Sequence, residues 1–357
     1  MNAPVPRPEQ SVRFAQLEDS AETARIDAFV SSHSNGTPFH RPAWQAAVAK
    51  ACGHSCHYLV VEDNRGDLAG VLPLTEIRSR LFGKALVSSG FAVDGGILAE
   101  SPMVEQALAA KAVTLARALA IPSVELRGGP APKGWTVDEG TYAGFSRPLA
   151  KDDDAELQAI PRKQRAEVRK ALGFDLAITV GTSAADRDAH YSVYATSVRN
   201  LGTPVFPRAL FEATLDAFGD AADILTVHRH GQPLASVLSL YHAGVVMPYW
   251  GGGTADARTW RANDLMYYAL MLHARAEKKC TTFDFGRSKV GTGPASFKKN
   301  WGFEAAPLSY AKWVADGAAP REINPMSPKY RFQVAAWKKL PLWLANGLGP
   351  LIARGLG

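Results

Sequence analysis

The sequence of 357 residues is long enough for two domains of ordinary size. Apolar residues make up 46% of it and charged residues 21%, a balance that is typical of globular proteins and excludes a largely disordered chain. Three cysteines exclude a disulfide framework, and no run approaches the roughly 20 apolar residues of a membrane-spanning helix. Because the N-terminal residues also lack the apolar stretch of a signal peptide, we expect a cytoplasmic protein.

The net charge of +6 is unevenly distributed along the chain. Residues 323–357 contain no Asp or Glu and five cations: Lys329, Arg331, Lys338, Lys339 and Arg354. Subtracting these five from +6 leaves +1 for the rest of the chain, so the folded body is nearly neutral. A nucleic-acid-binding body is therefore poorly supported, although the tail is cationic.

The first half of the sequence predicts a β-hairpin followed by a helix and a further strand. Residues 58–62 (YLVVE) and 68–74 (LAGVLPL) are apolar runs separated by the polar turn DNRGD. Ser101 is a good N-cap for a helix that starts at Pro102, and its apolar residues at helical spacing predict one buried face. Residues 123–126 predict the next strand, which ends in two glycines.

A basic segment follows, within residues 151–176. It contains PRKQRAEVRKALGFD and predicts a helix in which Arg162, Arg165 and Arg169 share one face. Such a stripe could contact a diphosphate or a tRNA backbone, and the alternative is a helix face that only meets water. The interpretation as a ligand contact places Arg162 and Arg165 in the cleft between two domains.

The second half repeats the first. Residues 234–240 (LASVLSL) match residues 68–74 at five of seven positions, at an offset of 166, and the run 224–233 precedes them as the other arm of a hairpin. A helix starting at Asn263 or Asp264 and a strand over residues 281–285 complete the same order of elements. The predicted domains are residues 1–150 and 177–322, joined by the basic helix of residues 151–176 and followed by the tail of residues 323–357.

Two blocks of the sequence resemble a known family. The segments FDFGRSKVGTGPASFKKNWGFEAAPLSY (residues 283–310) and SRLFGKALVSSGFAVDGGIL (residues 79–98) resemble the FemAB-like proteins that are associated with exosortase (PEP-CTERM) systems and exopolysaccharide loci. This resemblance implies an α/β fold with mixed sheets, made of two tandem GNAT-like acyltransferase domains. It also implies transfer of an acyl or aminoacyl group to a small-molecule or lipid-linked amine acceptor. The implied donors are acyl-CoA and aminoacyl-tRNA, used as co-substrates, and no tightly bound cofactor is expected.

The candidate site residues lie mainly in the second half. Trp250 ends an apolar strand and is a candidate contact with the substrate or donor, together with Gly251, Gly252 and Gly253 that follow it. The three glycines predict either a loop that approaches a phosphate closely or a mobile connection. Arg287 and Lys289 follow the strand that carries Asp284, where they could bind phosphate or carboxylate, unless Asp284 and Arg287 merely pair with each other. The resemblance also favours Lys298 as a ligand contact. Asp284 and Tyr249 are the candidate general bases.

Other catalytic chemistries find little support. Cys52, His54, Cys56 and His57 have no second cluster that would complete a zinc site, so no metal is predicted. A G-x-S-x-G nucleophile motif is missing from the sequence. The alternative to an amide-forming acyltransferase is a non-catalytic module of the same fold that binds a polysaccharide or a biosynthetic partner.

The cationic tail combines Trp and Leu with Lys and Arg, and Pro341 and Pro350 interrupt it. This composition suits the headgroup region of an anionic membrane, which would keep the protein at the inner membrane face near lipid-linked acceptors. The alternative is a C-terminal helix that packs on the body with its lysines in water.

Overall fold

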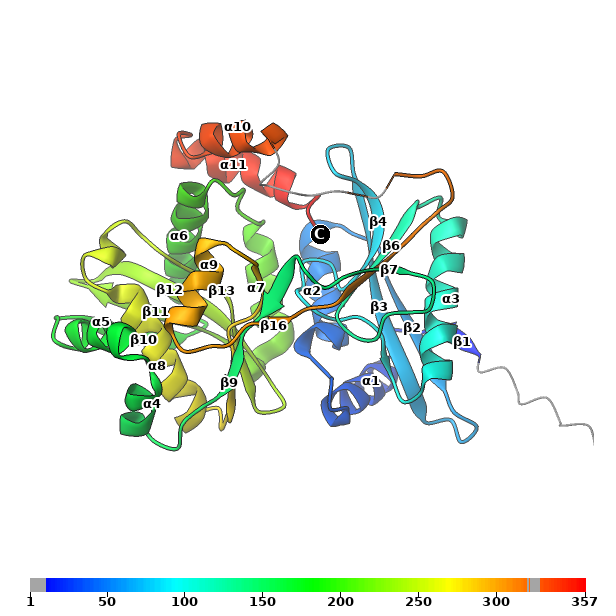
Figure 1. Ribbon diagram of the computed structural model, residues 1–357, viewed down its shortest axis with the longest axis horizontal. Coiled ribbons are helices and arrows are strands. Elements are labelled where there is room, and N and C mark those ends of the chain that lie inside the picture. Colours follow the sequence, from blue (N-terminus) through cyan, green and yellow to red (C-terminus); the bar gives the residue numbers. More distant parts are fainter. Residues whose placement is uncertain (1–10, 320, 322–327) are drawn as a thin grey trace, which may run out of the picture.

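The computed structural model describes residues 11–319, 321 and 328–357, which form two α/β domains side by side (Figure 1). The helices of the described residues are α1 (Ser20–Ser32), α2 (Pro42–Cys52), α3 (Pro102–Ala118), α4 (Asp153–Ala159), α5 (Arg162–Leu172), α6 (Ala184–Leu201), α7 (Arg208–Phe218), α8 (Ala262–Ala276), α9 (Gly293–Asn300), α10 (Pro328–Trp337) and α11 (Leu342–Ala353). Short 3-10 helices are η1 (Pro38–His40), η2 (Gly219–Ala221) and η3 (Asp256–Arg258).

Each domain is built on one mixed sheet. The first sheet has the order β1-β2-β3-β4-β6-β17-β7, with β5 beside β3, and the second has the order β10-β11-β12-β13-β14-β9. The strands of the first sheet are β1 (Val12–Phe14), β2 (Cys56–Glu62), β3 (Leu68–Ser79), β4 (Gly83–Ser88), β5 (Leu98–Ala99), β6 (Ser123–Arg127), β7 (Thr136–Asp138) and β17 (Tyr310–Val314). Those of the second are β9 (Ser146–Pro148), β10 (Ala177–Gly181), β11 (Ala222–Arg229), β12 (Gln232–His242), β13 (Val245–Gly253) and β14 (Thr282–Asp284). A small third sheet joins β8 (Tyr142–Gly144) to β15 (Ser288–Lys289) and β16 (Ala306–Pro307).

The predicted duplication is confirmed. In chain order the first domain reads β1, α1, α2, β2, β3, β4, α3, β6, and the second reads β10, α6, α7, β11, β12, β13, α8, β14. The matched segments of residues 68–74 and 234–240 lie in β3 and β12, which occupy the same third place in their sheets. In both sheets neighbouring strands are antiparallel except for one parallel pair, β4 with β6 and β13 with β14.

The two halves of the chain exchange their last strands. β9 precedes the second half in sequence but pairs with β14, whereas β17 follows the second half and pairs with β6 of the first domain. In Figure 1 the orange segment that leads to β17 crosses from one domain to the other. The domain limits predicted near residues 150 and 322 therefore do not follow the sheets. The predicted connecting helix also belongs to the second domain, because Ile160, Val168 and Ala171 lie in its core.

A shared aromatic core joins the two domains. Trp44 on α2 is fully buried and stacks on Trp250 of β13, with ring centroids 5.9 Å apart. The Nε1 of Trp44 donates a hydrogen bond to the carbonyl of Gly90 at 3.0 Å. Phe39 from the first domain and Phe211 from α7 of the second lie in the same cluster. Burial of this much aromatic surface fixes the relative position of the domains.

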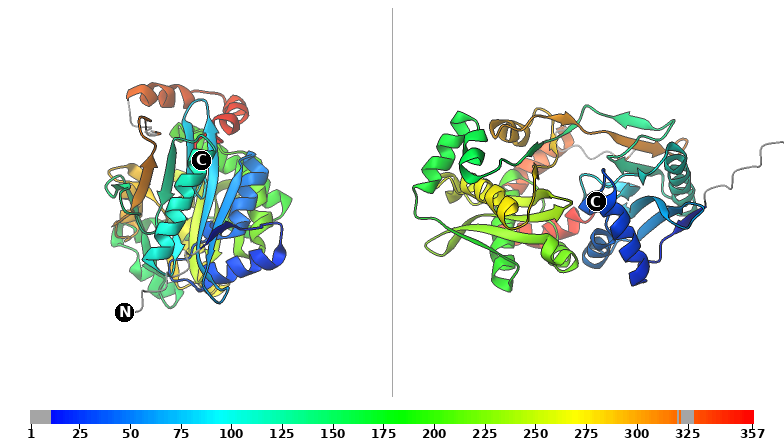
Figure 2. Two further views of the ribbon diagram at one scale, coloured as in Figure 1. Left: turned by 90° about the vertical axis from the view of Figure 1, so that its right-hand side faces the viewer. Right: turned by 90° about the horizontal axis from the view of Figure 1, so that it is seen from below.

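The C-terminal tail folds into two helices that lie along one edge of the molecule (Figure 2). α11 packs against α6, with Ala345 and Ala353 buried, as the packed-helix alternative predicts. Residues 323–327 of the predicted tail lie outside the described residues. No helix in the described part of the chain is long and apolar enough to cross a membrane.

We expect Trp44→Ala to lower the free energy of unfolding by about 3–5 kcal/mol, because it opens a cavity in the core between the domains. Urea denaturation followed by circular dichroism measures the change. Trp343→Ala is the matched control, because Trp343 is 74% exposed and its loss should cost less than about 0.5 kcal/mol. Equal effects of the two changes would contradict the role given to the interdomain core.

Candidate functional site

A pocket of about 790 Å³ opens in the second domain, between β13 and the helices α6, α8 and α9. β13 and β14 pair only at Val245 with Thr282 and at Val246 with Phe283, and then diverge. β13 continues along β12, while β14 continues along β9. Among the described residues no strand pairs with the open edge of β13 beyond Val246. The pocket thus lies where main-chain groups are available to a ligand.

The three glycines form the end of β13, which corrects the predicted loop. Gly251, Gly252 and Gly253 pair with three consecutive residues of β12 and also line the pocket. A Cβ atom at Gly252 would lie 2.6 Å from the Cβ of Ser197 on α6. At Gly253 it would lie 2.5 Å from the Oδ1 of Asn263 on α8. The glycines are required because two helices approach the strand closely.

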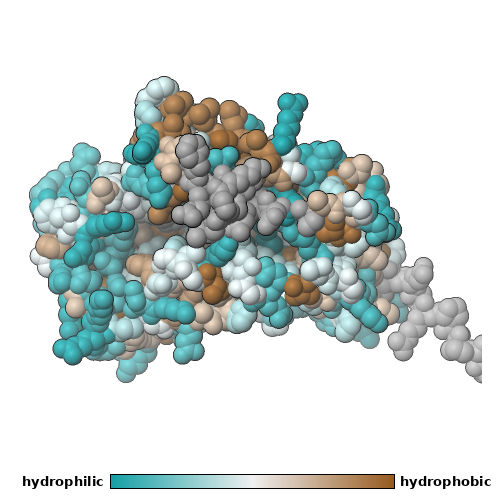
Figure 3. All heavy atoms as spheres, turned by 45° about the horizontal axis from the view of Figure 1, so that its top comes forward, coloured by the Kyte–Doolittle hydropathy of each residue, from teal (hydrophilic) through white to brown (hydrophobic). Residues whose placement is uncertain are grey.

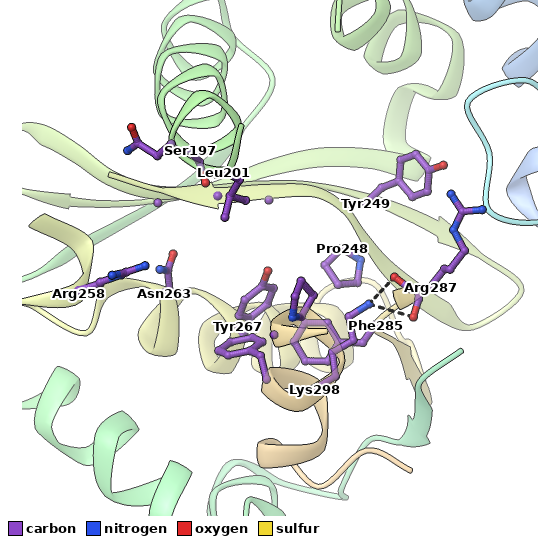
Figure 4. Close-up of a pocket in the computed structure, with 18 of the residues that line it drawn as sticks. Ser197, Leu201, Pro248, Tyr249, Arg258, Asn263, Tyr267, Phe285, Arg287 and Lys298 are labelled. Carbon is purple, nitrogen blue, oxygen red and sulfur yellow. Dashed lines mark hydrogen bonds between the residues drawn. The ribbon is translucent and has the colours of Figure 1, made fainter. Parts of the chain in front are cut away.

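One end of the pocket is polar and carries residues that the sequence analysis did not identify. Ser197 and Asn200 come from α6, Arg258 from η3, and Asn263 from the first turn of α8. Figure 4 shows Arg258 and Asn263 together at this end. An uncapped helix N-terminus offers free N–H groups, so this end combines hydrogen-bond donors with one cation. These polar residues are isolated in the sequence and come from separate elements. They form no motif from which the sequence could have predicted this end of the pocket.

The opposite end of the pocket faces the first domain and contains Arg287 (Figure 4). The Arg287 guanidinium lies 4.6 Å from the ring centroid of Tyr142, and its Nη1 donates to the hydroxyl of Tyr310 at 2.9 Å. Tyr310 in turn donates to the carbonyl of Val93 at 2.7 Å. Arg287 is therefore held by aromatic and hydroxyl groups, with no ion pair to Asp284 among the described contacts, so its charge can meet an anionic ligand.

Lys298 lies between the two ends of the pocket. Its Nζ donates to the carbonyls of Gly286 at 3.0 Å and Arg287 at 2.9 Å, drawn as dashed lines in Figure 4. An ammonium has three donors, so one N–H remains beyond these two bonds. Burial lowers the pKa of Lys298 to about 8, while the nearby charge of Asp284 opposes that shift. Lys298 can thus gain or lose its proton within the physiological range.

Two carboxylates are next in sequence to residues that line the pocket, since Asp94 follows Val93 and Asp284 precedes Phe285. Asp284 accepts a hydrogen bond from the N–H of Gly286 at 2.8 Å, and burial raises its pKa. Asp94 follows Val93, which lines the pocket, and burial raises its pKa to about 6, with a further contribution from Asp284. The Oδ1 of Asp94 accepts from the N–H of Gly95 at 2.7 Å. A carboxylate with a pKa near neutrality is suited to proton transfer.

Tyr249 and Trp250 differ from their predicted roles. Tyr249 lines the pocket, but its hydroxyl donates to the carbonyl of Phe91 at 2.5 Å, and burial raises its pKa. The phenol therefore stays protonated, whereas a general base must be free to accept a proton. Its hydrogen bond instead positions the first-domain loop that contains Phe91. Trp250, predicted as a donor contact, is 4% exposed and belongs to the interdomain core.

The remaining predicted contacts lie outside the pocket. Arg162 and Arg165 are on α5, which packs on α8 at the outer side of the second domain rather than between the domains (Figure 1). Arg165 bonds to Gln158 on the preceding helix. Lys289 lies in β15, paired with Tyr142 of β8. Their contact with a ligand stays a prediction. In the part of the chain that is described, no group of His, Cys, Asp and Glu side chains is placed to hold a metal ion.

We expect Asp94→Asn to raise the free energy of unfolding at pH 8 by on the order of 1 kcal/mol. The folded-state pKa of about 6 exceeds the ordinary 3.8, so the native state favours the protonated carboxyl. Stability contributed by that proton is present below pH 4 and is lost as the pH rises through 6. Urea denaturation of the parent and the variant at pH 4 and at pH 8 measures the effect. A gain at pH 4 equal to that at pH 8 would contradict this assignment.

Comparison with known proteins agrees with this geometry. Residues 160–299 match the family described as "Acetyltransferase (GNAT) domain". Curated protein sequences give no significant match. The fold is similar to the crystal structure of FemX, with a TM-score of 0.65 and 17% identity over 82% of this chain and 96% of that one.

Two further solved structures have a similar fold. A tandem GNAT protein from the clavulanic acid biosynthesis pathway has a TM-score of 0.54 and 14% identity, over 87% of this chain and 100% of that one. The C-terminal domain of a putative lysylphosphatidylglycerol synthetase from Agrobacterium fabrum has a TM-score of 0.55 and 12% identity, over 83% of this chain and 92% of that one. At these identities the similarity shows the fold alone. Residues 160–299 therefore resemble a GNAT acetyltransferase domain, and the chain has the fold of two tandem GNAT-like domains, as the sequence predicts.

Proposed function

We propose that the protein is an acyltransferase that forms an amide between a donor acyl or aminoacyl group and the amine of an acceptor. The observation that supports the proposal is the pocket beside the diverging strands β13 and β14. Lys298 and Arg287 line it, and two carboxylates of raised pKa, Asp94 and Asp284, adjoin its lining residues Val93 and Phe285. No side-chain nucleophile is needed, because the acceptor amine attacks the donor carbonyl directly once both are aligned.

Asp94, with Asp284 beside it, is the general base of the proposed reaction. The acceptor reacts as the neutral amine, after its ammonium form has released one proton to the solvent. The base then takes a second proton from the nitrogen as the C–N bond forms at the donor carbonyl carbon. A base with a pKa of about 6 is ionised at neutral pH and still close enough to that pH to transfer protons efficiently. Because Asp94 comes from the first domain and Asp284 from the second, the acceptor amine would bind where the domains meet.

Lys298 is the proposed stabiliser of the tetrahedral intermediate. The carbonyl oxygen becomes an oxyanion, which the remaining N–H of the Lys298 ammonium and main-chain N–H groups of β13 can bind. Collapse of the intermediate breaks the bond to the leaving group, which is C–S for a thioester and C–O for an aminoacyl ester. The leaving thiolate or alkoxide then takes up a proton, returned from the carboxyl base.

Acyl-CoA is the donor that the pocket favours first. Arg258, the first turn of α8 and the amides of Asn200 and Asn263 offer a cation and hydrogen-bond donors to a diphosphate at the end far from the first domain. An aminoacyl-tRNA remains the second donor to test. Its RNA backbone would extend beyond the pocket, where Arg162 and Arg165 are the predicted contacts.

The acceptor is proposed to carry an anionic group near its amine, because Tyr142 and Tyr310 hold the guanidinium of Arg287 beside the pocket. A bidentate contact to carboxylate or phosphate fits this guanidinium. The wider assignment is a cytoplasmic role in cell-envelope or exopolysaccharide synthesis, in the exosortase-associated subgroup. That assignment is supported by the sequence blocks of residues 79–98 and 283–310.

We expect a bell-shaped pH dependence of kcat/KM for the donor at saturating acceptor. Activity rises as the carboxylate base ionises through pH 6 and falls as Lys298 loses its proton above pH 8. Purified protein is incubated with acyl-CoAs, charged tRNAs and amine-bearing envelope precursors, and amide product is measured by mass spectrometry. Absence of transfer from every donor, together with absence of donor binding, would overturn the proposal.

Matched variants separate the two limbs of this profile. Asp94→Asn should lower turnover by at least about a hundredfold, and Lys298→Met by a similar factor. Lys298→Arg keeps the charge and should move the falling limb to higher pH. Lys299→Met is the control, because the neighbouring Lys299 is exposed on the same helix and lies outside the pocket lining. A loss of activity in Lys299→Met as large as in Lys298→Met would remove the special role of Lys298.

We expect Gly252→Ala to weaken acyl-CoA binding by at least about tenfold, since the added Cβ would push Ser197 and α6 out of place beside the pocket. Isothermal titration calorimetry measures the affinity. Gly140→Ala is the control, because a Cβ there would meet no atom within 4 Å. Unchanged affinity in a folded Gly252→Ala variant would place the donor elsewhere.

A further inference from the structure

The last helix of the chain buries its small residues and exposes its large ones. Ala345 is 2% exposed and Ala353 0%, and a Cβ at Gly349 would lie 3.0 Å from the main-chain nitrogen of Val205. The opposite face of α11 carries Trp343, which is 74% exposed, and Leu351, which is 62% exposed. A helix that served only to cover the body would turn these side chains inward. The outward face of α11 therefore needs another explanation.

The first domain adds to the same face. Leu81, at the tip of the β3–β4 hairpin, is 68% exposed and lines one shallow pocket together with Leu351. We call Leu81, Trp343, Leu348 and Leu351 the tail surface. In Figure 3 hydrophobic residues gather where α10 and α11 lie, along the top of the molecule. Apolar side chains from distant parts of the sequence thus share one exposed face.

The tail surface is held rigidly on the body. Nη2 of Arg321 donates to the carbonyls of Gly355 at 2.6 Å and Leu356 at 2.9 Å. The Nε2 of His54 lies 2.9 Å from the carbonyl oxygen of Arg354. These contacts connect the end of α11 to the first domain, so the exposed face is already formed before it meets a partner. Preorganisation of this kind lowers the entropic cost of binding.

The charge around the tail surface is mainly positive, because the pocket that Leu81 and Leu351 share is lined by Arg78, Arg80 and Arg354 and by one buried acid, Glu76. Lys338 and Lys339 precede α11 and are exposed, and Arg80 lies beside Leu81 at the hairpin tip and is exposed as well. Residues 323–357 contain no Asp or Glu. The apolar face is therefore accompanied by cations alone along the tail, and an anionic partner with an apolar interior complements it.

We propose that the tail surface docks on the anionic surface of a lipid bilayer. Trp343 and the three leucines enter the boundary between headgroups and acyl chains, where aromatic rings and short apolar faces are stable. Lys338, Lys339 and Arg80 meet the lipid phosphates. α11 has 12 residues and is too short to span, so it lies in the plane of the interface. The attachment is reversible, and it does not depend on the acyl-transfer proposal.

Co-sedimentation of the full chain with vesicles tests this docking. We expect binding to vesicles that contain phosphatidylglycerol, weaker binding to phosphatidylcholine alone, and release at high salt. The Lys338→Gln/Lys339→Gln variant should bind about fivefold more weakly for each cation removed. The Trp343→Glu/Leu351→Glu variant should lose at least about tenfold in affinity. Leu172→Glu is the control, because Leu172 is 52% exposed on α5, away from the tail surface, and should bind as the parent does.

A second readout keeps the test independent of folding in the variants. The difference in fluorescence between the parent and Trp343→Phe should shift to the blue when anionic vesicles are added, because Trp343 leaves water. Failure of the parent to bind anionic vesicles overturns the proposal, as does equal binding by Trp343→Glu/Leu351→Glu. If that double variant instead converts a dimer to a monomer in mass photometry and the parent does not bind vesicles, the tail surface belongs to a second copy of the chain.

Discussion

The hydrogen bonds that Tyr249 and Tyr310 donate to the loop of residues 91–94 hold the candidate site together. Tyr249 belongs to β13 of the second sheet and Tyr310 to β17, the strand that the second half contributes to the first sheet. Each hydroxyl donates to a carbonyl of the first-domain loop, and the same Tyr310 hydroxyl accepts from Arg287. Because buried polar groups are costly when unpaired, these bonds fix the loop in which Val93 lines the pocket of the other domain and Asp94 follows it.

The two duplicated domains differ at this loop. Two strand pairings correspond between the domains. Leu74–Ser88 of the first domain corresponds to Leu240–Met247 of the second, and Gly70–Ala99 corresponds to Ser236–Gly252. Between these pairs β13 continues as one strand, with a bulge at Tyr249, whereas the first domain has the longer loop of residues 89–97 between β4 and β5. That loop packs closely on its own domain at Gly96, where a Cβ would lie 2.0 Å from the carbonyl oxygen of Gly128, while its Val93 lines the pocket of the second domain. The second domain keeps the open pocket, and the first contributes Val93 to its lining.

Local patterns in the sequence predict the hairpins, the main helices and the repeat, because apolar periodicity depends on near neighbours. Arg287 is predicted from its place just after a strand, and Lys298 from the resemblance to a known family. The exchange of β9 and β17 was missed because strands of three and five residues pair across most of the chain, and such pairing leaves no local signal. Asp94 was missed for a related reason: its importance depends on the other domain. Gly251 to Gly253 were taken for a loop because glycine weakens strands in general, while here the closeness of α6 and α8 requires it.

The aromatic core between the domains also determines how ligands reach the site. A hinge motion that separated the domains would have to expose the aromatic core around Trp44, which residues from both domains form. Such a motion exposes too much apolar surface to occur readily. Entry must therefore use the opening of the pocket beside α6 and α9, which Leu201 and Pro294 line. In this arrangement the domain interface stays rigid during the proposed reaction, and motion during a reaction cycle is confined to the helices around the opening.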